Sequence, residues 1–166
     1  MMQALTIRAA TQADRPTLRQ AVIELQEYER RQSTTRLPGE QVVDAYLAWM
    51  GQRADGAGAL LVAEIDGRFA GFVVGWVEDA AYIAETADSS RFDLISDIFV
   101  VPEYRGRRIA ARLIEAMERD LGTRGVTRLR INALVSNVSA RRSYEHAGLV
   151  PYEVLREKMI DVRDHG

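Results

Sequence analysis

Four arginines cluster around a glycine directly after an apolar stretch of this sequence. Four guanidinium groups lie within eight residues, those of Arg105, Arg107, Arg108 and Arg112. Gly106 lies among them, and a helical pattern follows from Ile109 and Ala110 onward. A helix start offers unpaired backbone N–H groups and a positive dipole end, and a glycine lets the backbone approach a ligand closely. The segment suits a diphosphate, although solvated surface charge explains the arginines equally well when they are considered alone.

A second group of polar residues follows about 30 residues later, between Asn137 and Leu149. Asn137 is a good helix N-cap, Tyr144 has a hydroxyl that can donate a proton, and Gly148 is typical of a helix end. Each of these residues also has a purely structural explanation, for example a half-buried tyrosine in the core. The two segments favour a functional site only in combination, because both patterns occur in the same order with a strand between them.

Together the two segments resemble the GCN5-related N-acetyltransferase (GNAT) family. The first is similar to the family's acetyl-CoA motif, Q/R-x-x-G-x-G/A after a strand ending in V-x-P, with Arg105 first and Ala110 last. Arg108 replaces the internal glycine, and its backbone N–H stays available to a ligand if φ is negative. The second is similar to the family's N-x-x-A-x-x-x-Y-x-x-x-G-F/L element, of which every anchor is present, including Asn137 and Tyr144.

The resemblance implies acetyl-CoA as co-substrate and no metal ion. In this family the thioester arm pairs with the exposed edge of a strand that corresponds to Ile98–Val100, where a bulge frees a backbone N–H for the carbonyl oxygen. The asparagine contacts the cofactor, and the tyrosine lies near the sulfur. The implied cofactor-binding residues are Ile98, Phe99, Val100, Arg105, Gly106, Arg107, Arg108, Ile109, Ala110, Asn137 and Tyr144.

Two catalytic residues are predicted, Tyr144 as the acid and Asp97 as the base. An amine that attacks a thioester must be neutral, and the departing thiolate gains from a proton donor, a role that Tyr144 can fill. Several relatives carry a glutamate base on the central strand, but Leu94 or Ser96 occupies that position here. Asp97 is favoured over Glu78 as the base, and a structural carboxylate paired with an arginine is an equal alternative for Asp97.

The acceptor is expected to be a small-molecule or peptide amine. The two N-terminal helices, their joining loop and residues 78–91 are the least family-like parts, and they carry both acidic residues and arginines. The predicted activity is acetyl transfer to a primary amine by direct attack in a ternary complex. The alternatives are a catalytically weak or inactive CoA-binding regulator and an α/β interaction module. A homodimer is a possible assembly.

Composition narrows the class of protein further. The 166 residues include 22 basic and 24 acidic side chains and no cysteine. A net charge of −2 disfavours nucleic-acid binding, and disulfides and thiolate chemistry are excluded. No apolar run approaches the ~20 residues of a membrane span, and the N-terminus does not resemble a signal peptide. We therefore expect a cytoplasmic protein that forms one domain over residues 1–166, without membrane partners.

The hydrophobic period predicts an α/β fold with the order β-α-α-β-β-β-α-β-α-β, which the resemblance assigns to a mostly antiparallel sheet with helices on both faces. Asp66-Gly67 predicts a hairpin turn, and Thr11 a helix N-cap. The predicted elements include a strand over 92–101, a helix over 107–121, a strand over 129–135, a helix over 139–146 and a last strand over 152–160.

Overall fold

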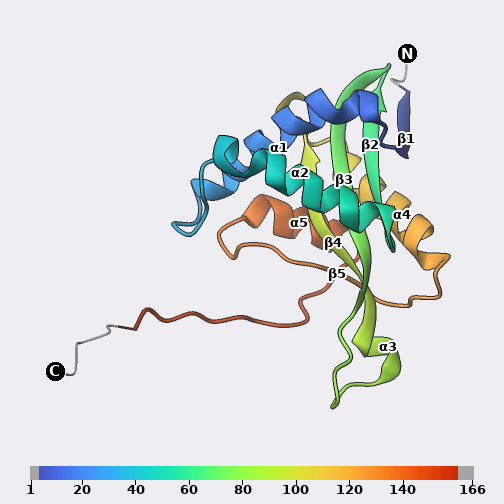
Figure 1. Ribbon diagram of the computed structural model, residues 1–166, viewed down its shortest axis with the longest axis vertical. Coiled ribbons are helices and arrows are strands. Elements are labelled where there is room, and N and C mark those ends of the chain that lie inside the picture. Colours follow the sequence, from blue (N-terminus) through green and yellow to red (C-terminus); the bar gives the residue numbers. More distant parts are fainter. Residues whose placement is uncertain (1–3, 161–166) are drawn as a thin grey trace.

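The computed structural model describes residues 4–160, and one five-stranded sheet forms its centre (Figure 1). The strands lie side by side in sequence order. Neighbouring strands are antiparallel except for the last pair, which is parallel. The strands are β1 (Leu5–Ala9), β2 (Gly58–Ile65), β3 (Arg68–Asp79), β4 (Arg91–Val100) and β5 (Leu129–Ile131). This arrangement confirms the predicted mixed, mostly antiparallel fold.

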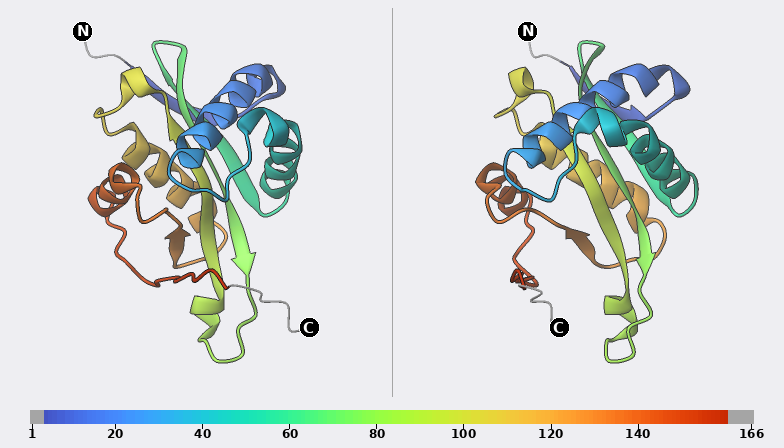
Figure 2. Two further views of the ribbon diagram at one scale, coloured as in Figure 1. Left: turned by 90° about the vertical axis from the view of Figure 1, so that its left-hand side faces the viewer. Right: turned by 60° about the vertical axis from the view of Figure 1, so that its left-hand side comes forward.

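Helices cover both faces of the sheet, as the two views of Figure 2 show. One face carries α1 (Arg15–Arg30) and α2 (Gly39–Asp55), and the other carries α4 (Ile109–Gly122) and α5 (Val138–His146). The short helix α3 (Ala87–Ser90) lies between β3 and β4, and two 3-10 turns span Gln12–Asp14 and Pro102–Tyr104. Within residues 4–160 no helix is long and apolar enough to cross a membrane.

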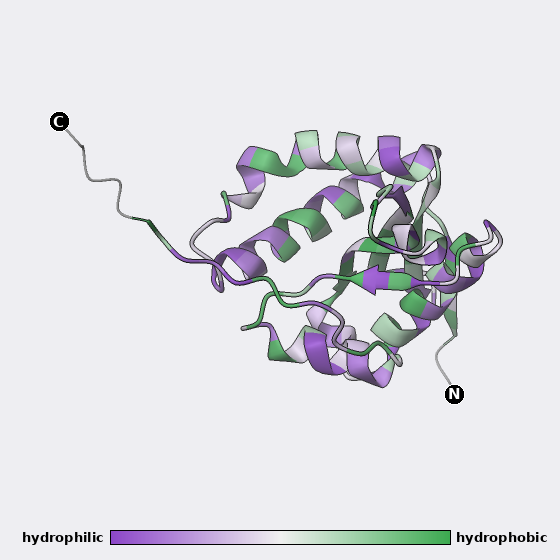
Figure 3. Cartoon of the chain, turned by 90° about the horizontal axis from the view of Figure 1, so that it is seen from below, coloured by the Kyte–Doolittle hydropathy of each residue, from purple (hydrophilic) through white to green (hydrophobic). Residues whose placement is uncertain are grey.

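Each face of the sheet has its own apolar core. Met50 of α2 and Phe72 of β3 are fully buried on the first face, and Leu113 and Met117 of α4 are fully buried on the second. Hydrophobic and hydrophilic residues mix along the helices in Figure 3, the pattern of helices that bury one side and expose the other. The two cores hold the sheet between rigid layers, so that its strands can position side chains.

Local sequence signals explain several of the element boundaries. Asp66 and Gly67 both have positive φ, 49° and 74°, as the predicted hairpin turn between β2 and β3 requires. Thr11 forms a capping box with Asp14, but the box caps a 3-10 turn that leads into α1. Helix α4 begins at Ile109, two residues later than predicted, because Arg108 has left-handed backbone angles and cannot continue a helix.

Strand β4 contains a β-bulge at Ser96. Val74 of β3 pairs with Asp97, whereas the next residue, Gly75, pairs with Ile95, so Ser96 is the extra residue of β4. A residue inserted in this way reverses which face of the sheet the following side chains occupy. Leu94 packs on the α1/α2 face, and beyond the bulge Phe99 packs on that face as well. Asp97, two residues before Phe99, is therefore turned toward α2.

Strands β4 and β5 pair over only three residues. The pairing ends at Ile95 with Ile131, and from Ser96 to Val100 the β4 edge has no pairing with β5. The predicted strand over 129–135 is thus correct only for its first part. Because β4 continues while β5 ends, the two segments separate and leave an opening beside the second half of β4.

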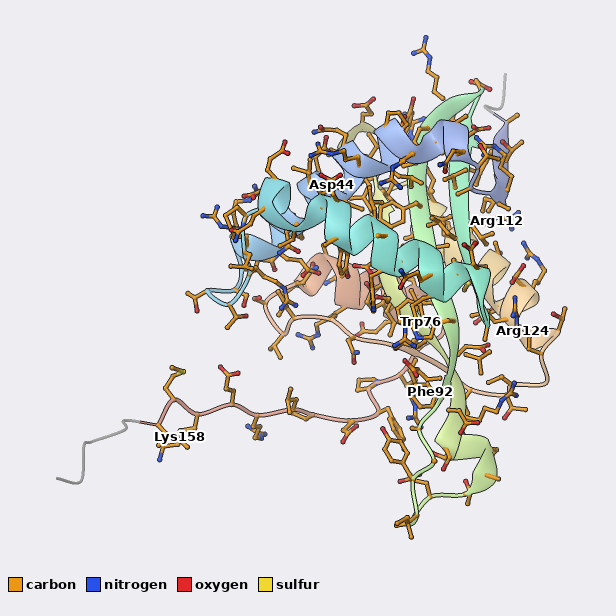
Figure 4. All side chains as sticks on the ribbon, in the orientation of Figure 1. Asp44, Trp76, Phe92, Arg112, Arg124 and Lys158 are labelled. Carbon is orange, nitrogen blue, oxygen red and sulfur yellow. The ribbon has the colours of Figure 1, made fainter. Side chains whose placement is uncertain are left out.

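The predicted last strand over 152–160 is wrong. Residues 151–160 have no secondary structure, and this segment extends away from the sheet in Figure 1. Lys158, labelled in Figure 4, lies on it at a distance from the helices. An alternating apolar pattern forms a strand only where a neighbouring strand supplies hydrogen bonds, and no described residue pairs with this segment.

Candidate active site

A cavity of about 540 Å³ lies where β4 and β5 separate. Its wall is formed by the β4 edge, the segment after β5, the first turn of α4, one face of α5 and the end of α1. All predicted site residues except Arg107 line it, namely Asp97, Ile98, Phe99, Val100, Arg105, Gly106, Arg108, Ile109, Ala110, Asn137 and Tyr144. The structure therefore brings together two segments that the sequence separates by about 30 residues.

The β4 edge faces this cavity with its backbone. Ser96 to Val100 line the cavity and are not paired with β5, so an extended ligand has access to this edge. The bulge lies at Ser96, two residues before the predicted segment that starts at Ile98. A bulge leaves one residue outside the regular ladder, and here that residue lies beside Asp97.

The loop before α4 turns twice into the left-handed region. Gly106 has φ 76° and Arg108 has φ 61° with ψ 19°. The condition set for the Arg108 backbone N–H, a negative φ, is therefore not met. The resembled motif carries glycine at this position, and the positive φ supplies a physical reason, because glycine is the residue that adopts it without strain.

The helix start at this loop is open. Within residues 4–160 no side chain caps the N-terminus of α4, so the N–H groups of its first turn can point to a ligand. Arg105 donates from Nε to the Val100 carbonyl at 3.1 Å, and its guanidinium lies over the Tyr28 ring, 5.6 Å from the centroid. Arg107 lies over the Tyr104 ring and does not line the cavity.

Asn137 and Tyr144 are both placed by α5. The Asn137 Oδ1 accepts a hydrogen bond from the Ala140 N–H at 3.1 Å, and so caps the helix as predicted. It also accepts one from the Tyr28 hydroxyl at 3.4 Å. Tyr144 follows two turns later on the side that lines the cavity. Burial raises the pKa of Tyr144, and the negative charges of Glu29 and Asp97 raise it further, so this phenol holds its proton at neutral pH.

Asp97 lines the cavity from β4, and its carboxylate is turned toward α2. Its carboxylate accepts hydrogen bonds from the Ser96 hydroxyl at 2.6 Å and from the Tyr46 hydroxyl at 2.9 Å. Burial raises the pKa of Asp97 and the charge of Glu29 raises it further, while the hydrogen bonds from Ser96 and Tyr46 and the charge of Arg36 lower it. No ion pair joins Asp97 to an arginine within the described residues, which argues against the purely structural alternative.

The other base candidate, Glu78, is not at this cavity. It accepts a hydrogen bond from the Trp76 indole at 2.8 Å and lies 3.6 Å from Arg53. It pairs across the sheet with Phe92, at the far end of β4 from the cavity. Its carboxylate is therefore engaged elsewhere in the molecule.

Two site residues, Tyr28 and Tyr46, escaped the sequence analysis, whereas Glu29 is one of the acidic residues of the N-terminal helices considered for the acceptor. Tyr28 and Glu29 line the cavity from α1, and Tyr46 reaches Asp97 from α2. Leu25, Tyr28 and Glu29 are spaced by three and four residues and thus share one helix face, a signal that only marks amphipathic packing. No motif could have identified Tyr46, because 51 residues separate it from the carboxylate that it contacts.

Known structures share this fold. The CoA complex of aminoglycoside N-acetyltransferase AAC(6')-Iy superposes with a TM-score of 0.69 and 22% identity, over 99% of this chain and 97% of that chain. AAC(6')-Ih from Acinetobacter baumannii gives 0.68 and 16% over 96% and 100%. A GCN5-related N-acetyltransferase from Ralstonia eutropha JMP134 gives 0.72 and 18% over 94% and 99%.

Sequence comparison identifies the family. Among curated proteins a search finds no significant relative of this chain. The family model described as "Acetyltransferase (GNAT) family" matches residues 22–149, which include the β4 edge, the α4 loop and α5. The match confirms the resemblance that the two motifs suggested, and the chain belongs to the acetyltransferase (GNAT) family.

Proposed function

We propose that this protein transfers an acetyl group from acetyl-CoA to a primary amine by direct attack in a ternary complex. The observation that carries the proposal is that one cavity joins the open helix start of α4 to Tyr144 and Asp97. Family membership and the shared fold of N-acetyltransferases support the reaction class.

The residues present fit the chemistry of CoA. The open N-terminus of α4 and the guanidinium groups of Arg105 and Arg108 suit a diphosphate. The unpaired β4 edge from Ile98 to Val100 suits an arm that carries amide groups, and Asn137 can bind its polar atoms. When bound there, acetyl-CoA supplies the acetyl group as an activated thioester.

Two side chains handle the protons of the transfer. Asp97 accepts a proton from the bound ammonium, so that the nitrogen can form a bond to the acetyl carbon. Tyr144 gives its proton to the sulfur as the carbon–sulfur bond breaks, and it recovers a proton from the nitrogen through solvent. The products are an N-acetylated amine and CoA with a free thiol, and one proton is released overall.

A cationic amine is the acceptor class that the cavity favours. Glu29 and Asp97 both line it, and their charges act on the same tyrosine, so a positive group between them is stabilised. One structural neighbour, the aminoglycoside N-acetyltransferase AAC(6')-Iy, was solved with the bisubstrate analogue CoA-S-monomethyl-acetylneamine. We therefore include aminoglycoside-like amines among the acceptors, together with polyamines.

The direct test measures CoA release from acetyl-CoA across a panel of amines. Aminoglycosides, polyamines, amino acids and a lysine peptide form the panel, and a cationic amine is expected to be the best substrate. Thermal unfolding with saturating CoA is measured in parallel. Binding of CoA without turnover of any amine would instead identify a regulator, and no CoA-dependent shift would refute the proposal.

We also propose that the protein works as a homodimer. Six large apolar side chains are between 61% and 92% exposed in the C-terminal segment: Val150, Tyr152, Val154, Leu155, Met159 and Ile160. Exposed large apolar side chains gathered in one segment, here among charged residues, are typical of an interface. Sedimentation velocity of the full chain is expected to give a dimer, and a chain that ends at residue 149 is expected to be a monomer.

A further inference from the structure

We propose that Tyr46 of α2 is a positioning residue that fixes the carboxylate of Asp97 at the wall of the cavity and stabilises its charged form. The proposal rests on the role of Asp97 in the proposed function. It assigns a task to a residue that lies outside both motifs and belongs to the other side of the sheet from α4 and α5.

The contact is made at both carboxylate oxygens. The Tyr46 Oη lies 2.9 Å from Oδ1 and 2.9 Å from Oδ2 of Asp97, so one O–H group is shared between the two acceptors. The Ser96 hydroxyl bonds only to Oδ2, at 2.6 Å. Because Ser96 is the bulge residue next to Asp97 on the same strand, Tyr46 is the donor that ties this carboxylate to a different element.

The Tyr46 ring is itself held by an aromatic stack. It stacks on the Trp49 ring with an angle of 21° between the planes and centroids 5.4 Å apart, and Trp49 meets the Trp76 ring edge-on at 5.0 Å. Trp76 is 3% exposed in β3 and is labelled in Figure 4 beside α2. Paired aromatic rings of this kind limit rotamer freedom. The aromatic stack therefore holds the Tyr46 hydroxyl in a fixed position next to Asp97.

Hydrogen bonds to a carboxylate favour its charged form, whereas burial disfavours it. The groups that face Asp97 come from four elements: Ser96 on β4, Tyr46 on α2, Glu29 and Arg36 at and after the end of α1, and Tyr144 on α5. Glu29 opposes the charge on Asp97, and Arg36 supports it from a distance while paired with Glu29 at 2.8 Å. The hydroxyl of Tyr46 thus offsets part of the cost of burying this base.

Tyr46→Phe tests the proposal, because it removes one hydroxyl and keeps the ring in its stack. The acid limb of the kcat/KM–pH profile is expected to move to higher pH by about one unit, since the charged form of Asp97 loses a donor. At high pH the rate is expected to approach that of the wild type. Tyr82→Phe, which removes an exposed hydroxyl near α3, is the matched control and should leave the profile in place.

A second readout does not depend on turnover. The carboxyl carbon signal of Asp97, assigned by its loss in Asp97→Asn, can be titrated by NMR in the free protein. Tyr46→Phe is expected to raise the titration midpoint by about one pH unit relative to the wild type. An unchanged midpoint in Tyr46→Phe would overturn the proposal, and so would a uniform drop in rate at every pH.

The two proposals fail in different ways. If Asp97→Asn keeps the full rate and the same pH profile, then Asp97 is not the base, and the proposed catalytic role fails together with this inference. If Asp97→Asn loses the acid limb while Tyr46→Phe leaves the limb and the midpoint in place, only the positioning role is wrong.

Discussion

Gly106 and Arg108 both have positive φ, 76° and 61°, so the loop before α4 enters the left-handed region twice within three residues. For glycine this conformation carries no steric penalty, whereas for an arginine it costs roughly 1 to 2 kcal/mol. The site thus contains one relaxed and one strained residue at the same helix start. The next two predictions concern Arg108, the strained residue.

Arg108→Gly is expected to raise the free energy of unfolding by about 0.5 to 1 kcal/mol. The relief of the left-handed strain exceeds the added backbone entropy of glycine in the unfolded chain. Urea unfolding measures the gain. Arg108→Ala is the matched control, because it keeps the Cβ atom and should show no gain.

The variants Arg108→Gly and Arg108→Ala also distinguish the contribution of the Arg108 backbone to CoA binding from that of its side chain. We expect both variants to lose about fivefold in CoA affinity, because each lacks the guanidinium that can pair with phosphate. Affinity equal to that of the wild type in Arg108→Gly would show that only the backbone at this position matters.

Gly106→Pro is expected to abolish the stabilisation by CoA. Proline fixes φ near −65°, which is incompatible with the observed 76°, so the loop cannot keep its shape. Saturating CoA should raise the melting temperature of the wild type and leave that of the variant unchanged. Gly125→Pro, at a second positive-φ glycine after α4, controls for a general loss of stability. A normal CoA shift in Gly106→Pro would place the phosphates elsewhere.

Tyr144→Phe is expected to lower kcat by roughly 10²-fold, the usual range for general acid–base assistance, with CoA affinity preserved. The ring stays in the cavity wall while the proton donor to the sulfur is lost. Steady-state kinetics and CoA titration measure the two effects separately. An undiminished kcat would remove Tyr144 from the mechanism.

Asp97→Asn is expected to lose most activity below neutral pH. Burial raises the pKa of Asp97, so the wild-type rate climbs as this carboxyl loses its proton and as more free amine becomes available. The loss in the variant should shrink at alkaline pH, where the free amine needs no base. A loss of the same size at every pH would assign Asp97 a structural role.

Asp93 is expected to make the fold less stable as pH rises. Its side chain is buried, 4% exposed, and its Oδ1 has no partner among the described residues. Burial raises the pKa of Asp93 to about 6, while the charges of Arg91 and Arg124 oppose the shift. The native state therefore holds a proton that the unfolded state releases near pH ~4. The contribution of Asp93 to stability is greatest below pH ~4 and is lost as pH rises through about 6, by an amount of the order of 2 kcal/mol.

Urea unfolding between pH 4 and 8 measures how the free energy of unfolding changes with pH. Asp93→Asn should flatten the decline, and Asp120→Asn, at a partly exposed carboxylate near Arg124, should not. A difference in stability between the wild type and Asp93→Asn that stays constant over this pH range would contradict the raised pKa.

Part of the structure could be predicted from the sequence, because it depends on residues that are close in the chain. The Asp66-Gly67 turn, the apolar faces of α4 and the N-cap at Asn137 depend on neighbouring residues only, and all three were predicted correctly. The same holds for the two motifs, whose residues meet at one cavity and whose family the comparisons confirm. Turn geometry, helical periodicity and capping act over a few residues, so a sequence alone carries them.

Other features depend on the tertiary structure and could not be predicted from the sequence. The residues after 150 alternate as a strand would, yet a strand also needs a partner, and whether a partner is present is not a local property. The bulge at Ser96 exists only in the register of β4 against β3, and it turns Asp97 toward Tyr46, 51 residues away. The placement of the proposed base and of its proposed positioning residue therefore depends on strand register and helix packing, because both arise from contacts between segments that are distant in the chain.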